Sequence, residues 1–185
     1  MRPKPPKRLV AVKVRGERSN ATAPNVWLAM DFVYDQLIES HRFKMLTVVD
    51  TYSKICPAIG VGTCYGGSDV VQALEQASQD YGLPKCIRVD NGLEFVSPDL
   101  DFLAYSQGVQ LDFSIPGKPT DNACIEAFNS RVRQECLNQH WFLDMAEAKA
   151  TIEACRQKYN RRCPHRALGD LTPLEFLQQA HEWGS

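Results

Sequence analysis

The chain has 185 residues, of which 44% are hydrophobic and 23% charged, and its formal net charge is −1. This length and composition suit one globular domain with a sizeable core and exclude a disordered or fibrous chain. The seven cysteines include no C-x-x-C pair. This argues against a disulfide framework or a zinc knuckle, so we expect reduced thiols packed as small hydrophobic side chains. No apolar run approaches the ~20 residues of a membrane helix, and we expect a cytoplasmic protein.

Residues 1–24 are predicted to form a basic extended arm or linker, and residues 25–180 a single core domain. Residues 1–18 contain seven Lys or Arg and one acid, whereas residues 19–117 contain five against twelve. Residues 118–166 are basic again, with nine against six. An acidic centre between basic segments suits a metal site surrounded by contacts to DNA phosphates, although charged runs are usually solvated surface.

Hydrophobic periodicity and turn signals predict an α/β domain. In chain order we expect three strands, a helix, a strand, a helix, a strand and three helices, at residues 26–33, 45–50, 55–63, 69–81, 86–90, 98–108, 109–113, 121–138, 144–160 and from Thr172 onward. The short link T-Y-S-K suits a hairpin between the second and third strands. This order predicts a five-stranded mixed sheet flanked by helices.

Asp31 lies inside an otherwise apolar predicted strand, W-L-A-M-D-F-V. An unpaired buried carboxylate is costly, so Asp31 needs a compensating partner. Because side chains alternate along a strand, Trp27, Ala29 and Asp31 share one face. The alternative is a structural role, in which this carboxylate caps a loop or pairs with an arginine.

Asp90 ends another predicted strand, in the stretch R-V-D-N-G. A hairpin turn is the alternative, since Asn-Gly is a turn signal. However, a helix capped by Ser97 follows, and no alternating partner strand comes directly after the turn. We therefore place Asp90 at the carboxyl end of a strand in a β-loop-α unit, where open α/β sheets carry their sites.

Glu126 lies on the predicted helix 121–138. One stripe of this helix is polar and the next is apolar, with Asn122, Glu126, Asn129 and Arg133 in the first and Ile125, Phe128 and Val132 in the second. The alternative is a Glu on a solvated face, making an i, i+4 contact of ~0.3 kcal/mol.

Together the three carboxylates predict a metal-dependent reaction on a phosphodiester. Such chemistry uses carboxylates that bridge two ions ~3.5–4 Å apart, one ion activating the attacking oxygen and the other stabilising the leaving oxygen. Mg²⁺ prefers oxygen ligands and keeps several waters, so few protein ligands suffice. We therefore expect two Mg²⁺ or Mn²⁺ ions held by Asp31, Asp90 and Glu126.

Several stretches between residues 24 and 178 carry motifs. They are W-L-A-M-D-F-V at 27–33, V-V-D-T-Y-S at 48–53, G-L-P-K at 82–85, R-V-D-N-G-L-E-F at 88–95, P-G-K-P-T-D-N-A-C-I-E-A-F-N-S-R-V-R at 116–133, and Y-N-R-R-C-P-H-R-A-L-G with L-T-P-L-E-F in the tail. Taken in this order, and with thirty-five residues between Asp90 and Glu126, they resemble the retroviral-integrase-like DDE transposases of bacterial insertion sequences.

The resemblance implies an RNase H-like fold and an enzyme that cleaves and transfers DNA strands, with Asp31, Asp90 and Glu126 as its catalytic carboxylates. It also implies DNA as the partner, both element ends and target, a homo-oligomer, and a nucleoid-associated protein of the bacterial cytoplasm. The DNA contacts predicted in this way are Asn122, Asn129, Arg133, Lys118 and Arg131. Relatives carry an upstream helix-turn-helix region, which we do not find in this chain.

Other residues depart from the family pattern or imitate it. Asp50 and Glu94 are acidic and fit family motifs, but as turn and loop residues. Cys163 stands where relatives usually have Arg, which leaves the DNA contact of the tail open. Asp121 stands where relatives often have a neutral residue, and it adds negative charge near the site. The alternative functions are another RNase H-like nuclease, which would hydrolyse without joining, or an inactive DNA-binding remnant, which would bind no divalent metal.

Overall fold

The structure, a computed structural model, describes residues 21–114 and 122–182. Residues 1–20 of the predicted arm, together with Lys118 and Asp121, lie outside the described residues. The order of secondary-structure elements agrees with the sequence expectation. Within the described ranges, no helix combines the length and apolar character needed to cross a bilayer.

Five strands form one mixed sheet in the order β3-β2-β1-β4-β5, which confirms the predicted sheet. The strands are β1 Trp27–Gln36, β2 Arg42–Asp50, β3 Ala58–Gly62, β4 Cys86–Val89 and β5 Gln110–Phe113. The first three pair antiparallel as a meander, whereas β1 with β4 and β4 with β5 pair parallel. The switch from antiparallel to parallel pairing therefore falls on β1.

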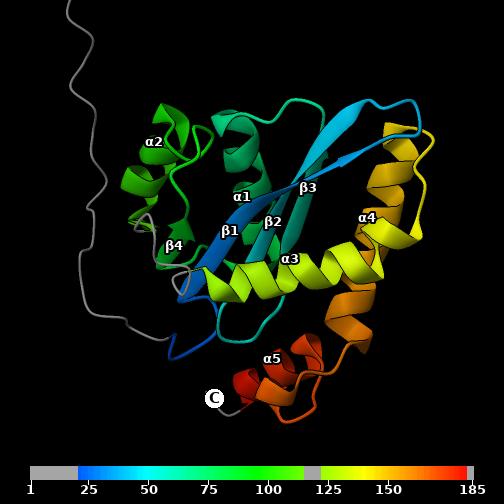
Figure 1. Ribbon diagram of the computed structural model, residues 1–185. Helices are drawn as coiled ribbons and strands as arrows, with labels where there is room; N and C mark the ends of the chain where they lie inside the picture. Colours follow the sequence, from blue (N-terminus) through cyan, green and yellow to red (C-terminus); the bar gives the residue numbers. More distant parts are fainter. Residues whose placement is uncertain (1–20, 115–121, 183–185) are drawn as a thin grey trace, which may run out of the picture.

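Helices cover both faces of the sheet (Figure 1). They are α1 Gly67–Tyr81, α2 Pro98–Gln107, α3 Ala123–Glu135, α4 Met145–Arg162 and α5 Pro173–Glu182, with short 3-10 turns at Leu137–Gln139 (η2) and Arg166–Leu168 (η3). The core on one face is filled from α1 and α2, and the core on the other from α3 and α4. α5 packs against α4.

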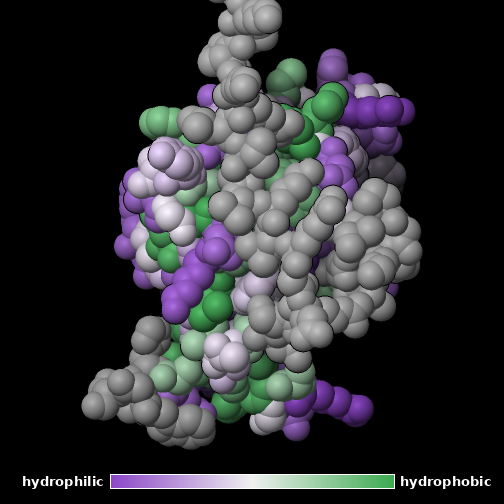
Figure 2. Space-filling view, turned by 90° about the vertical axis from the view of Figure 1, so that its left-hand side faces the viewer, coloured by the Kyte–Doolittle hydropathy of each residue, from purple (hydrophilic) through white to green (hydrophobic). Residues whose placement is uncertain are grey.

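Alternation along β1 explains why this strand supports both layers. Leu28 and Met30 belong to the core under α1 and α2, while Ala29 and Val33 belong to the core under α3 and α4. The outer surface of the molecule on the side of α2 shows hydrophobic residues mixed with hydrophilic ones (Figure 2). β1 is thus apolar on both sides, as expected for a strand at the centre of a covered sheet.

Several boundaries differ from the sequence expectation. β3 begins at Ala58 and not at residue 55, so residues 51–57 link β2 to β3, which is a longer link than the predicted T-Y-S-K. The hairpin of β1 and β2 is longer than predicted, because its ladder continues through a mainly polar stretch to the pair Gln36 and Arg42. The predicted helix 121–138 ends at Glu135 and continues as η2, after Cys136 departs from helical geometry with φ −127° and ψ −68°.

The prediction that all thiols are reduced is wrong for one pair. Cys136, which follows α3, forms a disulfide with Cys155 in α4, with 6.1 Å between their Cα atoms. The pairing arises from the packing of α3 on α4, which sequence spacing does not reveal. The other cysteines are free, and three of them, Cys56, Cys86 and Cys163, are buried, as expected for small hydrophobic side chains.

Candidate active site

Asp31 lies within β1, and Asp90 directly follows the neighbouring strand β4. The parallel ladder of β1 and β4 pairs Trp27 with Cys86 and ends with Ala29 opposite Arg88. Each aspartate comes two residues after this last pair, so the same register continued would place Asp31 opposite Asp90. Neighbouring strands are about 4.8 Å apart, and residues two apart share a face. Asp31 therefore belongs to the sheet face that α3 covers, and the same register would direct Asp90 to that face.

A hydrogen-bond network ties Asp31 to α3. Asn129 Nδ2 donates to Asp31 Oδ2 at 2.9 Å. The carboxylate can only accept, so it fixes which way the amide faces. The Thr47 hydroxyl, opposite Asp31 on β2, lies 2.8 Å from Asn129 Oδ1 and 3.0 Å from the Asp31 carbonyl, and can donate to either. The other carboxylate oxygen of Asp31 accepts the backbone N–H of Phe32 at 2.8 Å. This supplies the compensating partners that a carboxylate inside an apolar strand requires.

Electrostatics indicates that the three acids face one region. Burial raises the pKa of Asp31 above its ordinary value, and the negative charges of Asp90 and Glu126 raise it further. The Phe32 and Asn129 hydrogen bonds oppose this rise. Asp31 therefore lies near enough to both other carboxylates to be repelled by them, a repulsion that a bound cation would relieve.

Glu126 lies on α3, one turn before Asn129, and its side chain is exposed. Ile125, Phe128 and Val132 are buried in the core, so the predicted apolar stripe is the one that packs on the sheet. Residues three apart on a helix are neighbours. Glu126 therefore lies on the flank of α3 that reaches Asp31 through Asn129.

The three acids do not form a closed ligand cluster. In residues 21–114 and 122–182, no group of three His, Cys, Asp or Glu side chains is placed closely enough to hold a metal ion. The donor set nevertheless fits Mg²⁺ or Mn²⁺, since Asp31, Asp90 and Glu126 offer oxygen atoms alone and such ions retain several waters. Mutual repulsion also favours separation of carboxylates until a cation binds.

The residues predicted to contact DNA differ in the hydrogen bonds and ion pairs that they form within the protein. Arg133 is exposed and its Nη2 donates to the Tyr34 carbonyl at 2.9 Å. Arg131 instead pairs with Glu135 at 2.8 Å and lies 3.3 Å from a ring nitrogen of His165. For Asn122, which precedes α3, Oδ1 is buried and has no hydrogen-bond partner in the described part of the chain.

The two acidic residues assigned to turns and loops have structural partners. Asp50 is buried, and its Oδ2 accepts the Ser53 hydroxyl at 2.6 Å while its Oδ1 accepts the Tyr52 backbone N–H. Glu94 forms an ion pair with Lys44 on β2. Neither Thr47 nor Lys44 was predicted as a site residue. The signal for Thr47 was a polar residue inside the apolar run M-L-T-V-V.

The tail motif Y-N-R-R-C-P-H packs α4 onto the rest of the protein. Tyr159 stacks edge-on against Phe128 of α3, with ring centroids 4.8 Å apart. The Asn160 side chain exchanges two 2.9 Å hydrogen bonds with the backbone of Cys56. Cys163 is buried, with its sulfur 3.9 Å from a Glu135 oxygen. These residues hold helices together, so their recurrence in the motif has a structural explanation.

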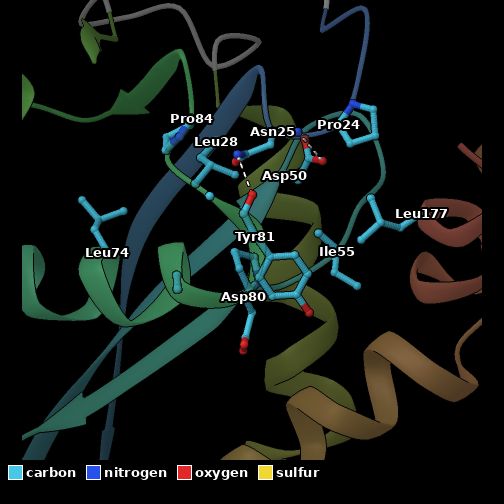
Figure 3. A pocket seen from close by; sticks show the side chains of 13 residues that line it. Pro24, Asn25, Leu28, Asp50, Ile55, Leu74, Asp80, Tyr81, Pro84 and Leu177 are labelled. Carbon is cyan, nitrogen blue, oxygen red and sulfur yellow. Dashed lines mark hydrogen bonds between the residues drawn. The ribbon is translucent and has the colours of Figure 1, made fainter. Parts of the chain in front are cut away.

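A cavity of about 190 Å³ lies at another place, where β1 begins (Figure 3). α1 contributes Leu74 and Tyr81 to its lining and α5 contributes Leu177, while Asn25 Nδ2 donates to the Tyr81 carbonyl at 2.8 Å. The lining is mainly apolar and includes none of the three acids of the candidate site. It is therefore no candidate for the metal-dependent chemistry.

Comparison with known families gives a consistent match along the chain. A family model described as Integrase core domain matches residues 21–119, which is more than half of the chain. A second model with the same description matches residues 107–173. The two matches together include all three acids of the candidate site.

Similar proteins come from bacterial insertion elements. The insertion element IS407 uncharacterized 31.7 kDa protein of Burkholderia multivorans is 48% identical over 154 residues, covering 83% of this chain and 56% of that protein. The insertion element IS476 uncharacterized 39.2 kDa protein of Xanthomonas euvesicatoria is 41% identical, over 92% and 50%. Transposase InsF for insertion sequence IS3A of Escherichia coli is 24% identical, over 84% and 55%. The chain spans about half the length of these relatives.

Solved structures of retroviral proteins share the fold. The simian T-cell lymphotropic virus intasome, in complex with PP2A regulatory subunit B56 gamma, matches with a TM-score of 0.76 and 18% identity, over 91% of this chain and 59% of that chain. The HTLV-2 integrase catalytic core domain in complex with magnesium, in a trimeric form, matches with a TM-score of 0.69 and 18% identity, over 84% and 97%. These likenesses confirm the predicted RNase H-like fold.

Proposed function

Because the chain belongs to the integrase core domain family, we propose that it is the catalytic core of an insertion-sequence transposase, which cuts and joins DNA strands with divalent metal ions. The relatives from insertion elements support this assignment. The single observation that carries it is the 2.9 Å hydrogen bond from Asn129 to Asp31, which joins the helix that carries Glu126 to the strand that carries Asp31.

Asp31, Asp90 and Glu126 are the residues proposed to hold Mg²⁺ or Mn²⁺, as two ions. Bound divalent ions would supply activation of the attacking oxygen and stabilisation of the leaving oxygen in an in-line displacement. Magnesium in the HTLV-2 catalytic core structure supports this choice. Within the chain, Asn129 holds the Asp31 carboxylate in one orientation, and Thr47 holds Asn129.

The proposed substrates are the element ends and a target DNA, in the bacterial cytoplasm at the nucleoid. Arg133 is exposed beside the site, and a guanidinium is well suited to bind a phosphate at two points. Asn122, Asn129 and Lys118 are proposed as further contacts. Arg131 must first leave Glu135 to join them. We also propose a homo-oligomer, as trimeric and dimeric forms of the HTLV-2 core suggest.

The test is strand transfer by the purified protein on DNA carrying element ends, in Mg²⁺ or Mn²⁺ and in a chelator. Glu126→Gln should lower the rate by at least about a thousandfold, equivalent to ~4 kcal/mol, while the melting temperature stays near that of the wild type. Glu75→Gln is the matched control, because Glu75 is exposed on α1, which covers the other face of the sheet.

Three results would contradict the proposal. Strand transfer that persists in the chelator would exclude the metal-dependent mechanism. Full activity of Glu126→Gln would remove this residue from the site. Hydrolysis of DNA without any joining would point to another RNase H-like nuclease.

A further inference from the structure

The two aspartates lie beyond the hydrogen bonds that hold their strands together. The ladder of β1 and β4 ends at Ala29 and Arg88, and Asp90 follows the last residue of β4. Each carboxylate therefore stands on a backbone segment whose separation from the other is not set by that ladder. Other contacts must fix the position of Asp90. The β5 side supplies two of them, because the Ser114 N–H donates to the Val89 carbonyl at 2.8 Å and the Asn91 side chain donates to the Ser114 carbonyl at 2.9 Å. The loop after β4 supplies contacts toward β1 and β2.

One contact is an ion pair between that loop and β2. Lys44 Nζ meets Glu94 Oε1, and the two side chains are only 16% and 22% exposed. The hydrogen bond from Lys44 lowers the pKa of Glu94, so the carboxylate is charged at neutral pH. Lys44 lies opposite Tyr34 in the hairpin of β1 and β2. The pair thus ties the loop to the antiparallel part of the sheet.

The second contact is aromatic and leads to Asp31. The Phe32 ring lies 5.0 Å from Lys44 Nζ and has its centroid 5.1 Å from that of Phe95, which is fully buried. The backbone N–H of Phe32 is the group that donates to Asp31 Oδ1. A shift of Lys44 or Phe95 would therefore move Phe32, the residue next to Asp31.

The turn at Gly92 connects Glu94 with Asp90. The Gly92 N–H donates to Asp90 Oδ1 at 2.8 Å, and the N–H groups of Phe95 and Val96 both donate to the Gly92 carbonyl at 3.0 Å. A Cβ placed on Gly92 would lie 2.9 Å from Asp90 Oδ1 and 3.3 Å from Glu94 Oε2. The Asp90 and Glu94 carboxylates therefore both lie next to Gly92. A movement of the Glu94 side chain would thus affect the turn that holds Asp90.

From these contacts we propose that Lys44 and Glu94 form a positioning pair, which holds the loop after β4 so that Asp90 stays near Asp31. Neither residue is a metal ligand in this proposal, because Glu94 Oε1 is paired with the Lys44 ammonium group. The proposal rests on the proposed function, since it treats the two aspartates as ligands of the same ions.

The test compares Lys44→Met, Glu94→Gln and the exchange variant Lys44→Glu with Glu94→Lys. Two measurements need no DNA: hydrogen exchange of the Gly92 amide by NMR without metal, and Mn²⁺ affinity by calorimetry. Each single variant should speed exchange of this amide and weaken Mn²⁺ binding about tenfold, the usual size of an effect from a residue that orients a ligand. The exchange variant should restore most of both.

Glu153→Gln is the matched control. It breaks a comparable ion pair with Arg156 inside α4, where the two side chains are 43% and 18% exposed. This variant should lower the melting temperature slightly. It should leave the exchange rate of the Gly92 amide and the Mn²⁺ affinity unchanged, because both residues of this pair lie within α4.

The outcomes separate the two proposals. Unchanged exchange and affinity in Lys44→Met would overturn the positioning role, whatever happens to the melting temperature. Weak Mn²⁺ binding in Glu94→Gln together with normal binding in Lys44→Met would also overturn it, since Glu94 would then be a ligand itself. Wild-type protein that binds Mn²⁺ and shows the expected shifts, but transfers no strands, would support the positioning role and overturn the proposed function.

Discussion

The two faces of the sheet are built on different principles. Under α1 and α2 the core is mainly apolar, with Leu46, Ile87 and Leu100 fully buried, and its buried polar residues Ser97 and Asp101 lie at the N-cap and in the first turn of α2. Under α3 and α4 the apolar core is interrupted where Asp31, Thr47 and Asn129 meet. β1 belongs to both faces, because its side chains alternate between them.

This contrast indicates that one face of the sheet contributes mainly to stability and that the other carries the candidate site. The apolar face gains free energy from burial and has no polar groups to satisfy at its centre. The α3 face buries part of a carboxylate, which burial and two neighbouring charges hold at a raised pKa. Substitutions on the two faces should therefore affect different measurements, and the following predictions test this in order of decreasing effect.

The largest effect should come from Asp31→Asn on the α3 face. We expect strand transfer to fall by about a thousandfold or more, ~4 kcal/mol in the barrier, because the variant loses a proposed metal ligand. Since the folded state raises the pKa of Asp31, the ionised form opposes folding, and the variant should be no less stable than the wild type at neutral pH. Asp80→Asn, exposed on α1, is the control for both measurements.

On the opposite face, Leu100→Ala should be costly in stability alone. Leu100 is fully buried, and its truncation should lower the free energy of unfolding by ~3 kcal/mol in urea titrations. Leu143→Ala, at a side chain that is 66% exposed, should change it by less than ~0.5 kcal/mol. A clear loss of Mn²⁺ affinity in Leu100→Ala, measured where the protein is folded, would show that the two faces are not separable.

A smaller effect is expected from Asn129→Ala, which removes the hydrogen bond to Asp31 but no proposed ligand. Strand transfer should fall roughly 10- to 100-fold, because Asp31 loses the group that orients it. Asn138→Ala, exposed in η2, should leave the rate unchanged. If both variants behaved alike, the network between α3 and β1 would have no part in the chemistry.

The smallest effect should be the pH dependence of the Lys44–Glu94 pair. Lys44 lowers the pKa of Glu94 below its ordinary value of 4.5 in the folded protein. The pair therefore stabilises the fold above that pH and ceases to do so as the pH falls through the lowered pKa. At pH 7, Lys44→Met should melt about 2 °C below the wild type, and the difference should vanish in acid. A difference that stayed constant down to pH 2 would exclude this pair as its origin.

Most of the fold could be predicted from the sequence, because it depends on local periodicity. The alternation in W-L-A-M-D-F-V and the spacing of Val70, Leu74 and Ala77 reappear as β1 and as the buried side of α1. The ends of elements were less predictable. The hairpin extends up to Gln36 through a mainly polar stretch, in which Phe43 is the residue that is buried in the core.

The candidate site was predictable only in part. Alternation placed Asp31 on one face of its strand. The resemblance then grouped Asp31 with Asp90 and Glu126 as the carboxylates of one site. The Thr47 hydroxyl, the Lys44–Glu94 pair and the Cys136–Cys155 bond escaped prediction, because each joins residues from different elements. Such contacts depend on strand register and helix packing, which one sequence without its structure does not specify.

The Cys136–Cys155 bond has a practical consequence for biochemical work on this protein. It closes a loop across a sequence separation of 19 residues. A cross-link of that size lowers the entropy of the unfolded chain and so raises the free energy of unfolding by about 3 kcal/mol. The thiol reagents used during purification decide whether the polypeptide is prepared with or without the link. The two preparations should migrate differently on non-reducing gels, and comparisons among variants require a single, defined oxidation state.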